Sequence, residues 1–183
     1  MTDQEVKSLF SGNIGIEYGQ FYIDIPEPEE DDEEDYLDPD GAFENQQNGI
    51  CGAAQTGKIL FVVGPQAGVA AISVELSKSE PMLDQTYDEI VEVAFSRGSS
   101  EVAVCEWGGG ETYPLDIPEG DYVVRYSILG MGRDYDEDSD WDAPVEGQKH
   151  LIQLWPSNQA QEKIVKVTSE IASYWHKEWG SQK

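Results

Sequence analysis

Histidine, cysteine and basic residues are scarce in this chain of 183 residues, which contains two His, two Cys and 11 Lys and Arg. General-base and nucleophilic catalysis usually draws on His or on an activated Cys. His150 and His176 lie in no recognisable catalytic pattern, and the sequence has no Gly-x-Ser-x-Gly or His-Glu-x-x-His motif. We therefore expect a protein that is not an enzyme and that carries no cofactor.

Long apolar runs are also missing, since the longest unbroken aliphatic or aromatic stretch is residues 59–63. The first residues contain no basic region followed by an apolar stretch. The sequence therefore predicts neither a membrane span nor a signal peptide. Cys51 and Cys105 lie in apolar, strand-like segments, where a free cysteine acts as a small hydrophobic residue. We expect both to be reduced rather than joined in a disulfide, in a cytoplasmic protein.

Acidic residues, in contrast, are abundant: 37 Asp and Glu give a formal net charge of −26. They concentrate in two runs, residues 27–40 and residues 134–142, and the first includes seven consecutive carboxylates at residues 29–35. Consecutive carboxylates repel one another and have no apolar face to bury, so we interpret both runs as solvent-exposed loops. Such a field repels nucleic acid and anionic membranes and attracts basic proteins. The alternative is that the acidity serves only solubility or a saline habitat.

Apolar residues that alternate with polar ones predict strands over most of the chain. A length of 183 residues with 39% hydrophobic content suits one domain, residues 1–183, with one core. In the clearest strand, residues 122–128, the side chains of Tyr122, Val124, Tyr126 and Ile128 share one face. The other expected strand segments are residues 14–25, 48–63, 69–76, 90–95, 101–107 and 151–155.

Two details of these strands can be predicted from local signals. The alternation in residues 14–25 changes phase at Gly19, which indicates a bulged strand. Residues 90–95 and 101–107 flank an Arg-Gly-Ser-Ser turn, which predicts that they pair as a hairpin.

The period changes after Pro156, where Ile164, Val167, Ile171 and Trp175 recur at intervals of three and four residues. This pattern predicts a C-terminal helix over residues 157–179 that begins with an Asn158–Gln161 capping box. No helical pattern separates the strands. We therefore predict a mainly β fold, an antiparallel β-sandwich of about seven or eight strands in residues 14–155. The acidic loops 27–40 and 134–142 interrupt it, residues 1–13 form a tail, and the helix packs on the sandwich.

One segment has the spacing of a phosphate-binding P-loop: Gly-Ala-Ala-Gln-Thr-Gly-Lys at residues 52–58. Ile59 stands where the motif requires a Ser or Thr to bind magnesium. The residues that follow are strand-like, whereas a phosphate site needs a helix N-terminus there. We interpret this segment as a turn into a strand.

The second acidic run begins like a calcium-binding loop, with alternate carboxylates at Asp134, Asp136 and Asp138. Ser139 occupies the position of the required glycine, and Val145 occupies that of the bidentate glutamate. This excludes an EF-hand. A weak, irregular calcium site at the three aspartates remains an alternative to a simply solvated loop, and we expect no dedicated metal site.

Three segments carry a resemblance to a known family: Ile-Glu-Tyr-Gly-Gln-Phe at residues 16–21, Gly-Ile-Cys-Gly-Ala-Ala-Gln at residues 49–55, and Leu-Asp-Ile-Pro-Glu-Gly-Asp-Tyr at residues 115–122. In this order, over about residues 14–128, the chain resembles the competence protein J family, the small bacterial inhibitors of the DNA-entry nuclease. The resemblance implies a β-rich domain that binds and blocks a nuclease without catalysis of its own.

The chain departs from that family at the acidic insertion of residues 27–40 and beyond about Gly130. The C-terminal part resembles instead a group of bacterial proteins without an assigned function. The particular nuclease is therefore not implied. A toxin-immunity protein would show the same architecture, because it too needs only to cover a nuclease.

We therefore expect an acidic inhibitor or immunity protein that binds a nuclease, a toxin or another basic protein, and that binds no nucleic acid or membrane itself. DNA carries about one charge per 3.4 Å along each strand, and an extended chain advances about the same distance per residue. The consecutive carboxylates can thus imitate a DNA strand. The expected partner-binding residues are Glu29, Glu30, Asp31, Asp32, Glu33, Glu34 and Asp35, with Tyr36, Tyr135 and Trp141 as aromatic anchors beside the acids.

Two alternatives remain open at this point. The three aromatic side chains can instead fold back onto the scaffold. The whole protein can instead be a β-sandwich adaptor or ligand-binding module whose acidic loops bind Ca²⁺ or are merely solvated.

Overall fold

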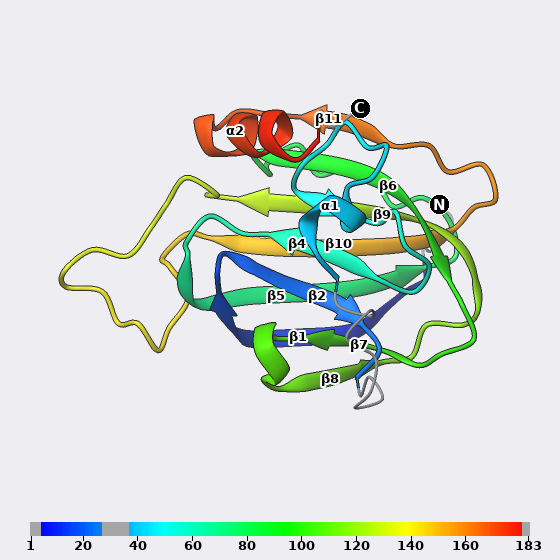
Figure 1. The fold of residues 1–183 in the computed structure, drawn as a ribbon, viewed down its shortest axis with the longest axis horizontal. Helices are drawn as coiled ribbons and strands as arrows, with labels where there is room; N and C mark the ends of the chain where they lie inside the picture. The colour runs from blue at the N-terminus through cyan, green and yellow to red at the C-terminus, as the bar shows by residue number, and fades with distance from the viewer. Residues whose placement is uncertain (1–4, 27–36, 181–183) are drawn as a thin grey trace.

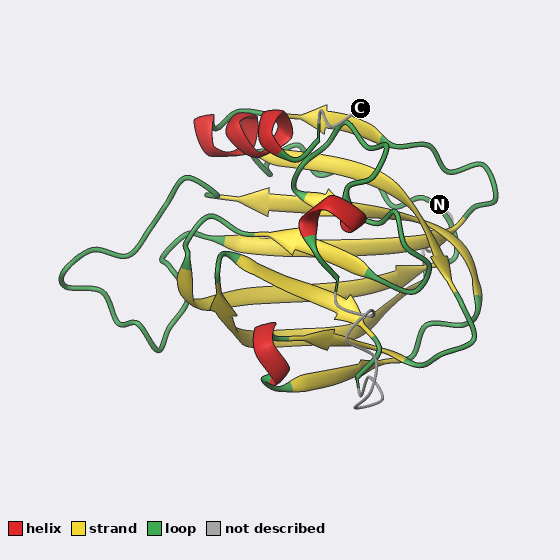
Figure 2. Ribbon diagram, in the orientation of Figure 1, coloured by secondary structure: helices red, strands yellow, loops and turns green. Residues whose placement is uncertain are grey.

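The computed structural model describes residues 5–26 and 37–180, which form one curled β-sheet with short helices on it (Figures 1 and 2). The eleven strands have the order β11-β6-β9-β10-β5-β1-β2-β4-β3, and β7 pairs with β2 and β8. The strands are β1 (Val6–Glu17), β2 (Gln20–Asp24), β3 (Cys51–Gly52), β4 (Ile59–Val62), β5 (Ala67–Ser77), β6 (Glu89–Arg97), β7 (Val102–Cys105), β8 (Thr112–Leu115), β9 (Gly120–Leu129), β10 (Lys149–Pro156) and β11 (Lys163–Lys166). The helices are α1 (Pro39–Ala42), the 3₁₀ turn η2 (Trp107–Gly109) and α2 (Glu170–Glu178).

The expected mainly β fold is confirmed, but its architecture differs from the antiparallel sandwich of seven or eight strands. The sheet is a curled, mixed half-barrel, because β10 runs parallel to β5, with His150 opposite Ile72 and Leu154 opposite Leu76. The expected hairpin also does not form: β6 pairs with β9 and β11, whereas β7 pairs with β2 and β8. Periodicity reports which face of a strand is buried, and it carries no information about the neighbour or its direction.

The core fills the concave side of the sheet and is rich in aromatic residues. The rings of Phe21 and Phe61 stack with centroids 4.7 Å apart, and the Tyr126 ring meets Phe61 edge-on at 4.9 Å. The predicted apolar face of β9 is confirmed, since Tyr122, Val124, Tyr126 and Ile128 are all buried. β4 is buried over its whole length, as its unbroken apolar run suggests.

The other face of β9 is also buried, which the sequence pattern does not reveal. Arg125 on this face is only 2% exposed, and its guanidinium donates to the Glu92 carboxylate at 2.8 Å. It also donates to the Pro81 carbonyl oxygen at 2.9 Å and lies over the Trp155 ring. An ion pair and a neighbouring aromatic ring therefore allow a charged residue to be buried here.

The first strand begins earlier and ends differently than expected. β1 already begins at Val6, so residues 6–13 belong to the sheet and not to a tail, and they pair with β5. The phase change at Gly19 is a tight turn between β1 and β2, not a bulge, because Glu17 lies opposite Gln20. Tyr18 and Gly19 have φ angles of 55° and 68°, as in the mirror-image turns that join hairpin strands.

The C-terminal helix is shorter than the predicted range of residues 157–179. Residues 163–166 form the edge strand β11, and α2 begins only after Ser169, whose hydroxyl accepts from the Ala172 amide at 3.1 Å. The Asn158–Gln161 capping box is therefore wrong. Ile164 and Val167 are 39% and 37% exposed, so the apparent helical period combines residues of two different elements.

Buried contacts fix both ends of α2 to the sheet. Glu89 of β6 is fully buried, and its carboxylate accepts from the Thr168 amide at 3.0 Å, the Thr168 hydroxyl at 3.1 Å and the Ser169 amide at 2.8 Å. Near the other end, the Nδ1 atom of His176 accepts from the Gly49 amide at 3.0 Å. The helix is thus part of the folded scaffold.

We predict that Glu89→Ala lowers the free energy of unfolding by about 2–4 kcal/mol, because it leaves the donors of the segment before α2 without their buried acceptor. The matched control is Glu170→Ala in the exposed first turn of α2, which should cost less than about 1 kcal/mol. Denaturant melting measures both. Equal small losses would contradict the role given to Glu89.

Candidate functional site

The two acidic runs are attached to opposite ends of the sheet. The expected carboxylates at residues 29–35 and Tyr36 lie outside the described residues. The first run follows β2, whereas the second lies between β9 and β10. β2 and β10 run in the same direction, because β2 is antiparallel to β1, β1 is antiparallel to β5, and β5 is parallel to β10. The end of β2 and the start of β10 therefore lie at opposite ends of the sheet.

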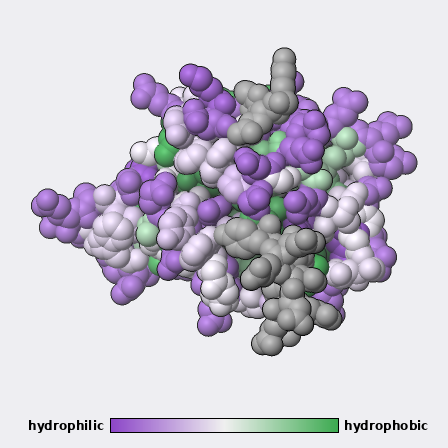
Figure 3. All heavy atoms as spheres, in the orientation of Figure 1, coloured by the Kyte–Doolittle hydropathy of each residue, from purple (hydrophilic) through white to green (hydrophobic). Residues whose placement is uncertain are grey.

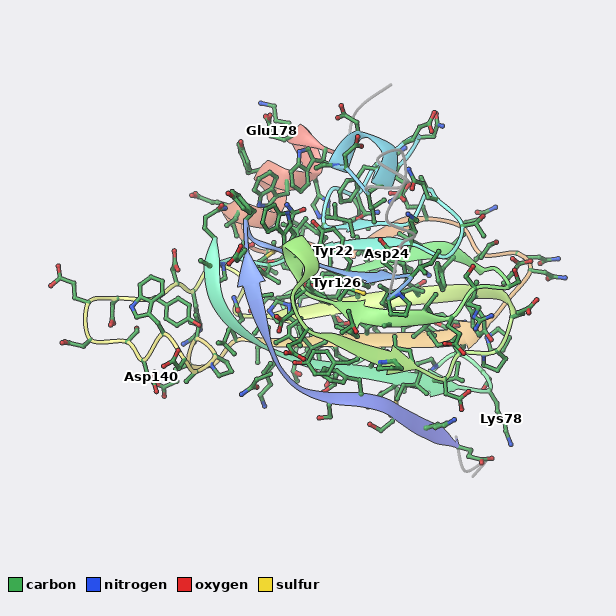
Figure 4. All side chains as sticks on the ribbon, turned by 60° about the horizontal axis from the view of Figure 1, so that its bottom comes forward. Tyr22, Asp24, Lys78, Tyr126, Asp140 and Glu178 are labelled. Atoms are coloured by element: carbon green, nitrogen blue, oxygen red, sulfur yellow. The ribbon has the colours of Figure 1, made fainter. Side chains whose placement is uncertain are left out.

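The second run lies in the middle of the segment between β9 and β10, residues 130–148, which we call the 130–148 loop. It projects from one end of the sheet (Figure 1), and Asp140 is labelled on it in Figure 4. The Tyr135 hydroxyl accepts from the Val69 amide at 2.8 Å and donates to the Ala143 carbonyl oxygen at 2.7 Å. Val69 also forms a parallel bridge with Pro144. These contacts tie the base of the loop to β5.

A glycine in β5 makes room for this attachment. Gly68 has a φ angle of 121°, and a Cβ atom at this position would lie 2.3 Å from the Tyr135 ring. Any larger residue would therefore push the ring away from the sheet. The close approach holds Tyr135 half-buried, so this predicted anchor folds back onto the scaffold.

Trp141 is the exposed aromatic residue of the loop. Its ring stacks on the Tyr135 ring with centroids 4.4 Å apart and an interplanar angle of 15°, and 55% of its surface remains exposed. The loop also carries exposed carboxylates on both sides of Trp141 in the sequence, and the surface seen in Figure 3 is largely hydrophilic; these carboxylates belong to Asp134, Asp136, Glu137, Asp138, Asp140 and Asp142. The loop therefore presents one supported aromatic ring within a field of negative charge.

The weak candidate metal ligands of the loop shape its turns instead. One oxygen of Asp136 accepts from the Asp138 amide at 3.1 Å and from the Ser139 hydroxyl at 3.0 Å. The Asp134 carboxylate accepts from the Tyr135 amide at 2.8 Å. Among residues 5–26 and 37–180, no three His, Cys, Asp or Glu side chains are grouped so that they could hold a metal ion.

A second exposed aromatic pair, which the sequence analysis did not identify, lies at the same end of the sheet. Tyr18, in the turn between β1 and β2, is 63% exposed, and its ring centroid is 4.6 Å from that of Trp107 in η2. Trp107 in turn packs against the core. The only sequence signal is a Tyr-Gly pair at the phase change, because the partner ring is far away in the chain.

The residues with the most reactive side chains are buried. Burial lowers the pKa of His150 to about 3, and its Nδ1 atom lies 2.8 Å from the Tyr126 hydroxyl. Burial also raises the pKa of the Cys51 thiol and raises that of Cys105 to about 11, and both cysteines are free. Lys58 of the P-loop-like segment is buried with its Nζ atom 3.7 Å from the Asp24 carboxylate, so it does not point outward to bind phosphate.

The lowered pKa of His150 predicts acid sensitivity. Since the folded pKa lies below the ordinary value of 6.5, the unfolded state binds a proton that the folded state excludes, and stability falls as the pH falls from about 6.5 toward 3. The loss approaches about 1.4 kcal/mol per pH unit within this window. We predict a flatter curve of unfolding free energy against pH between pH 6 and 4 for His150→Leu than for the wild type. Parallel curves would contradict this assignment.

In the described part of the chain, no helix is long and apolar enough to cross a membrane. No protein-family model matches the sequence, and no curated protein does. The fold is similar to that of ComJ from Bacillus subtilis, described as an inhibitor of the DNA degrading activity of NucA, with a TM-score of 0.52, 19% sequence identity, and 84% of this chain and 99% of ComJ covered.

It is also similar to a protein described as crocagin biosynthetic gene J, with a TM-score of 0.51, 15% identity and the same two coverages. The expected resemblance to the competence protein J family is confirmed. At these identities it shows a shared fold, which extends over more of the chain than residues 14–128.

Proposed function

We propose that this protein is a non-catalytic inhibitor that binds a nuclease, or another basic protein, and covers its working surface. The observation that carries this proposal is the fold, because it matches nearly the whole of ComJ, a nuclease inhibitor. The net charge of −26 supports it, since a nuclease must carry positive charge where it holds the DNA backbone. We infer a cytoplasmic place of action from the sequence.

The acidic runs would attract the partner before contact. Charges of one sign raise the rate of encounter with an oppositely charged protein, and salt weakens this effect. We propose that the carboxylates of residues 29–35 replace DNA phosphates in the cleft of the partner, with Tyr36 as a neighbouring anchor. The carboxylates of the 130–148 loop add to the same field from the other end of the sheet.

The 130–148 loop would then hold the partner after contact. Trp141 is exposed and already positioned by its stacking on Tyr135, and the Tyr135 hydroxyl fixes this stack to β5. Aromatic residues that are rigid before binding lose little conformational freedom on binding and often dominate interface energy. In this proposal Trp141 contacts the partner, and Tyr135 is the residue that positions it.

The proposal can be tested with a panel of purified bacterial nucleases that includes NucA. Replacement of the seven carboxylates at residues 29–35 by Asn and Gln should slow association with the inhibited nuclease by about tenfold or more at low salt, and the difference should shrink as salt is added. Stability should change little or rise, because self-repulsion is relieved. Stopped-flow association and thermal melting measure these effects.

The matched control removes seven exposed carboxylates that lie outside both runs in the sequence: Glu5, Asp84, Glu101, Asp116, Glu119, Glu170 and Glu178. Because both variants have the same net charge, a difference between their association rates depends on where the charges were removed and not on how many. If association slows equally in both variants, the carboxylates of residues 29–35 contribute only to the overall charge and do not replace DNA phosphates. A wild-type protein that inhibits no nuclease of the panel would overturn the proposed function.

A further inference from the structure

The turn between β1 and β2 contains a residue that the fold alone does not explain. Its first central residue, Tyr18, has a φ angle of 55°, which Gly, Asn and Asp adopt far more readily than an aromatic residue. The side chain is 63% exposed, so burial returns little of this cost. Residues held in sparsely populated backbone conformations tend to occur at functional sites.

The segment that contains Trp107 supports the Tyr18 ring. The Trp107 ring lies against Tyr18 on one side and packs against the core. The Glu106 carboxylate, adjacent to Trp107, accepts from the Gly15 amide of β1 at 2.6 Å and from the Glu111 amide at 3.2 Å. The segment that carries Trp107 is therefore fastened to the strand that carries Tyr18.

The strand register places this pair next to the base of the 130–148 loop. Glu17 lies opposite Ala67, and Ile16 lies opposite Gly68, the residue covered by the Tyr135 ring. The Gly19 amide donates to the Gln66 carbonyl oxygen at 2.8 Å, just before the start of β5. The two aromatic pairs are thus attached within a few residues of each other, at one end of the β1–β5 ladder.

The two pairs also share one design. In each, an inner ring is half-buried against the scaffold, Trp107 in one and Tyr135 in the other. The outer ring contacts it and is exposed to solvent: Tyr18 lies tilted at 52° against Trp107, and Trp141 is stacked on Tyr135. Isolated exposed aromatic residues are common, but two supported pairs at one end of a sheet are typical of an interaction surface.

We propose that Tyr18 on Trp107 and Trp141 on Tyr135 form one partner-binding surface, and that its occupant is a protein with a basic surface. This inference rests on the proposed function and adds Tyr18 as a contact residue. Glu17 directly precedes Tyr18 in the chain, Glu111 follows the η2 turn that contains Trp107, and both are exposed, as are the acids that flank Trp141 in the loop. Arg and Lys side chains can bind such carboxylates and also lie over aromatic faces.

Charge complementarity selects this occupant over the alternatives. A second copy of this chain carries the same charge of −26, and nucleic acid is also an anion, so both are repelled from this end of the molecule. A basic partner gains attraction from the surrounding carboxylates and contact area from the rings. The rigid rings should act mainly by slowing dissociation.

The test uses Tyr18→Asn, because Asn tolerates the left-handed backbone conformation and removes the ring. The full-length variant should melt at the wild-type temperature or slightly higher. It should need at least about tenfold more protein for half-inhibition of the nuclease that the wild type inhibits, chiefly through faster dissociation. Trp141→Ala should show a loss of the same kind. The matched control, Tyr174→Ala, removes a tyrosine that is 52% exposed on α2 and should inhibit like the wild type.

The results separate this surface from the proposed function. If Tyr18→Asn or Trp141→Ala inhibits as well as the wild type, the shared surface is wrong and the inhibitor function stands. If Tyr174→Ala weakens inhibition as much as Tyr18→Asn does, the effect is not specific to this end of the sheet, and the proposal also fails. If the wild type inhibits no nuclease of the panel, the function and this inference fall together.

Discussion

The antiparallel ladder between β1 and β5 is the constraint on which the rest of the structure depends. It runs from the pair Val6–Ser77 to the pair Glu17–Ala67, with a single irregularity between Ser8 and Phe10. On one side of it lie β10, β9, β6 and β11, and on the other side lie β2, β4 and β3, with β7 and β8. The ladder joins the two parts of the half-barrel. It also brings the turn at Tyr18 next to the strand that holds Tyr135.

The few basic residues mostly serve the fold, which leaves the negative field outside. Arg125 and Lys163 both pair with the Glu92 carboxylate at 2.8 Å, and Lys58 faces Asp24 from a buried position. On the surface, Lys7 pairs with Asp116 and Lys78 pairs with Glu5. A protein with so little positive charge cannot neutralise its own surface. The excess negative charge therefore remains on the surface, where it favours contact with basic proteins over contact with anionic ones.

Local pattern was sufficient for some elements and insufficient for others, for identifiable reasons. The strand at residues 122–128 and its apolar face were predicted correctly from alternation, whereas the burial of the opposite face was not, because polar residues such as Arg125 occupy it. A tight turn and a bulge shift the phase of alternation in the same way, so the turn at Gly19 was misassigned. Exposed Ile164 and Val167 imitated a helical period although Ile164 lies in the edge strand β11 and Val167 directly follows it. Trp141 was proposed as a contact residue because of its acidic neighbours in the sequence, whereas the contact of Tyr18 with Trp107 exists only through the fold.

In the proposed inhibitor, charge and aromatic contact would make different contributions to binding. An anionic surface alone gives fast association that salt weakens, and DNA offers the same attraction to a nuclease. Exposed aromatic rings would add contact that salt screens little and that a phosphate backbone does not offer. Because Tyr135 and Trp107 support the outer rings before binding, these rings would lose little conformational entropy when a partner binds. Long residence on the enzyme would therefore depend on the rings, whereas the carboxylates would determine how quickly the complex forms.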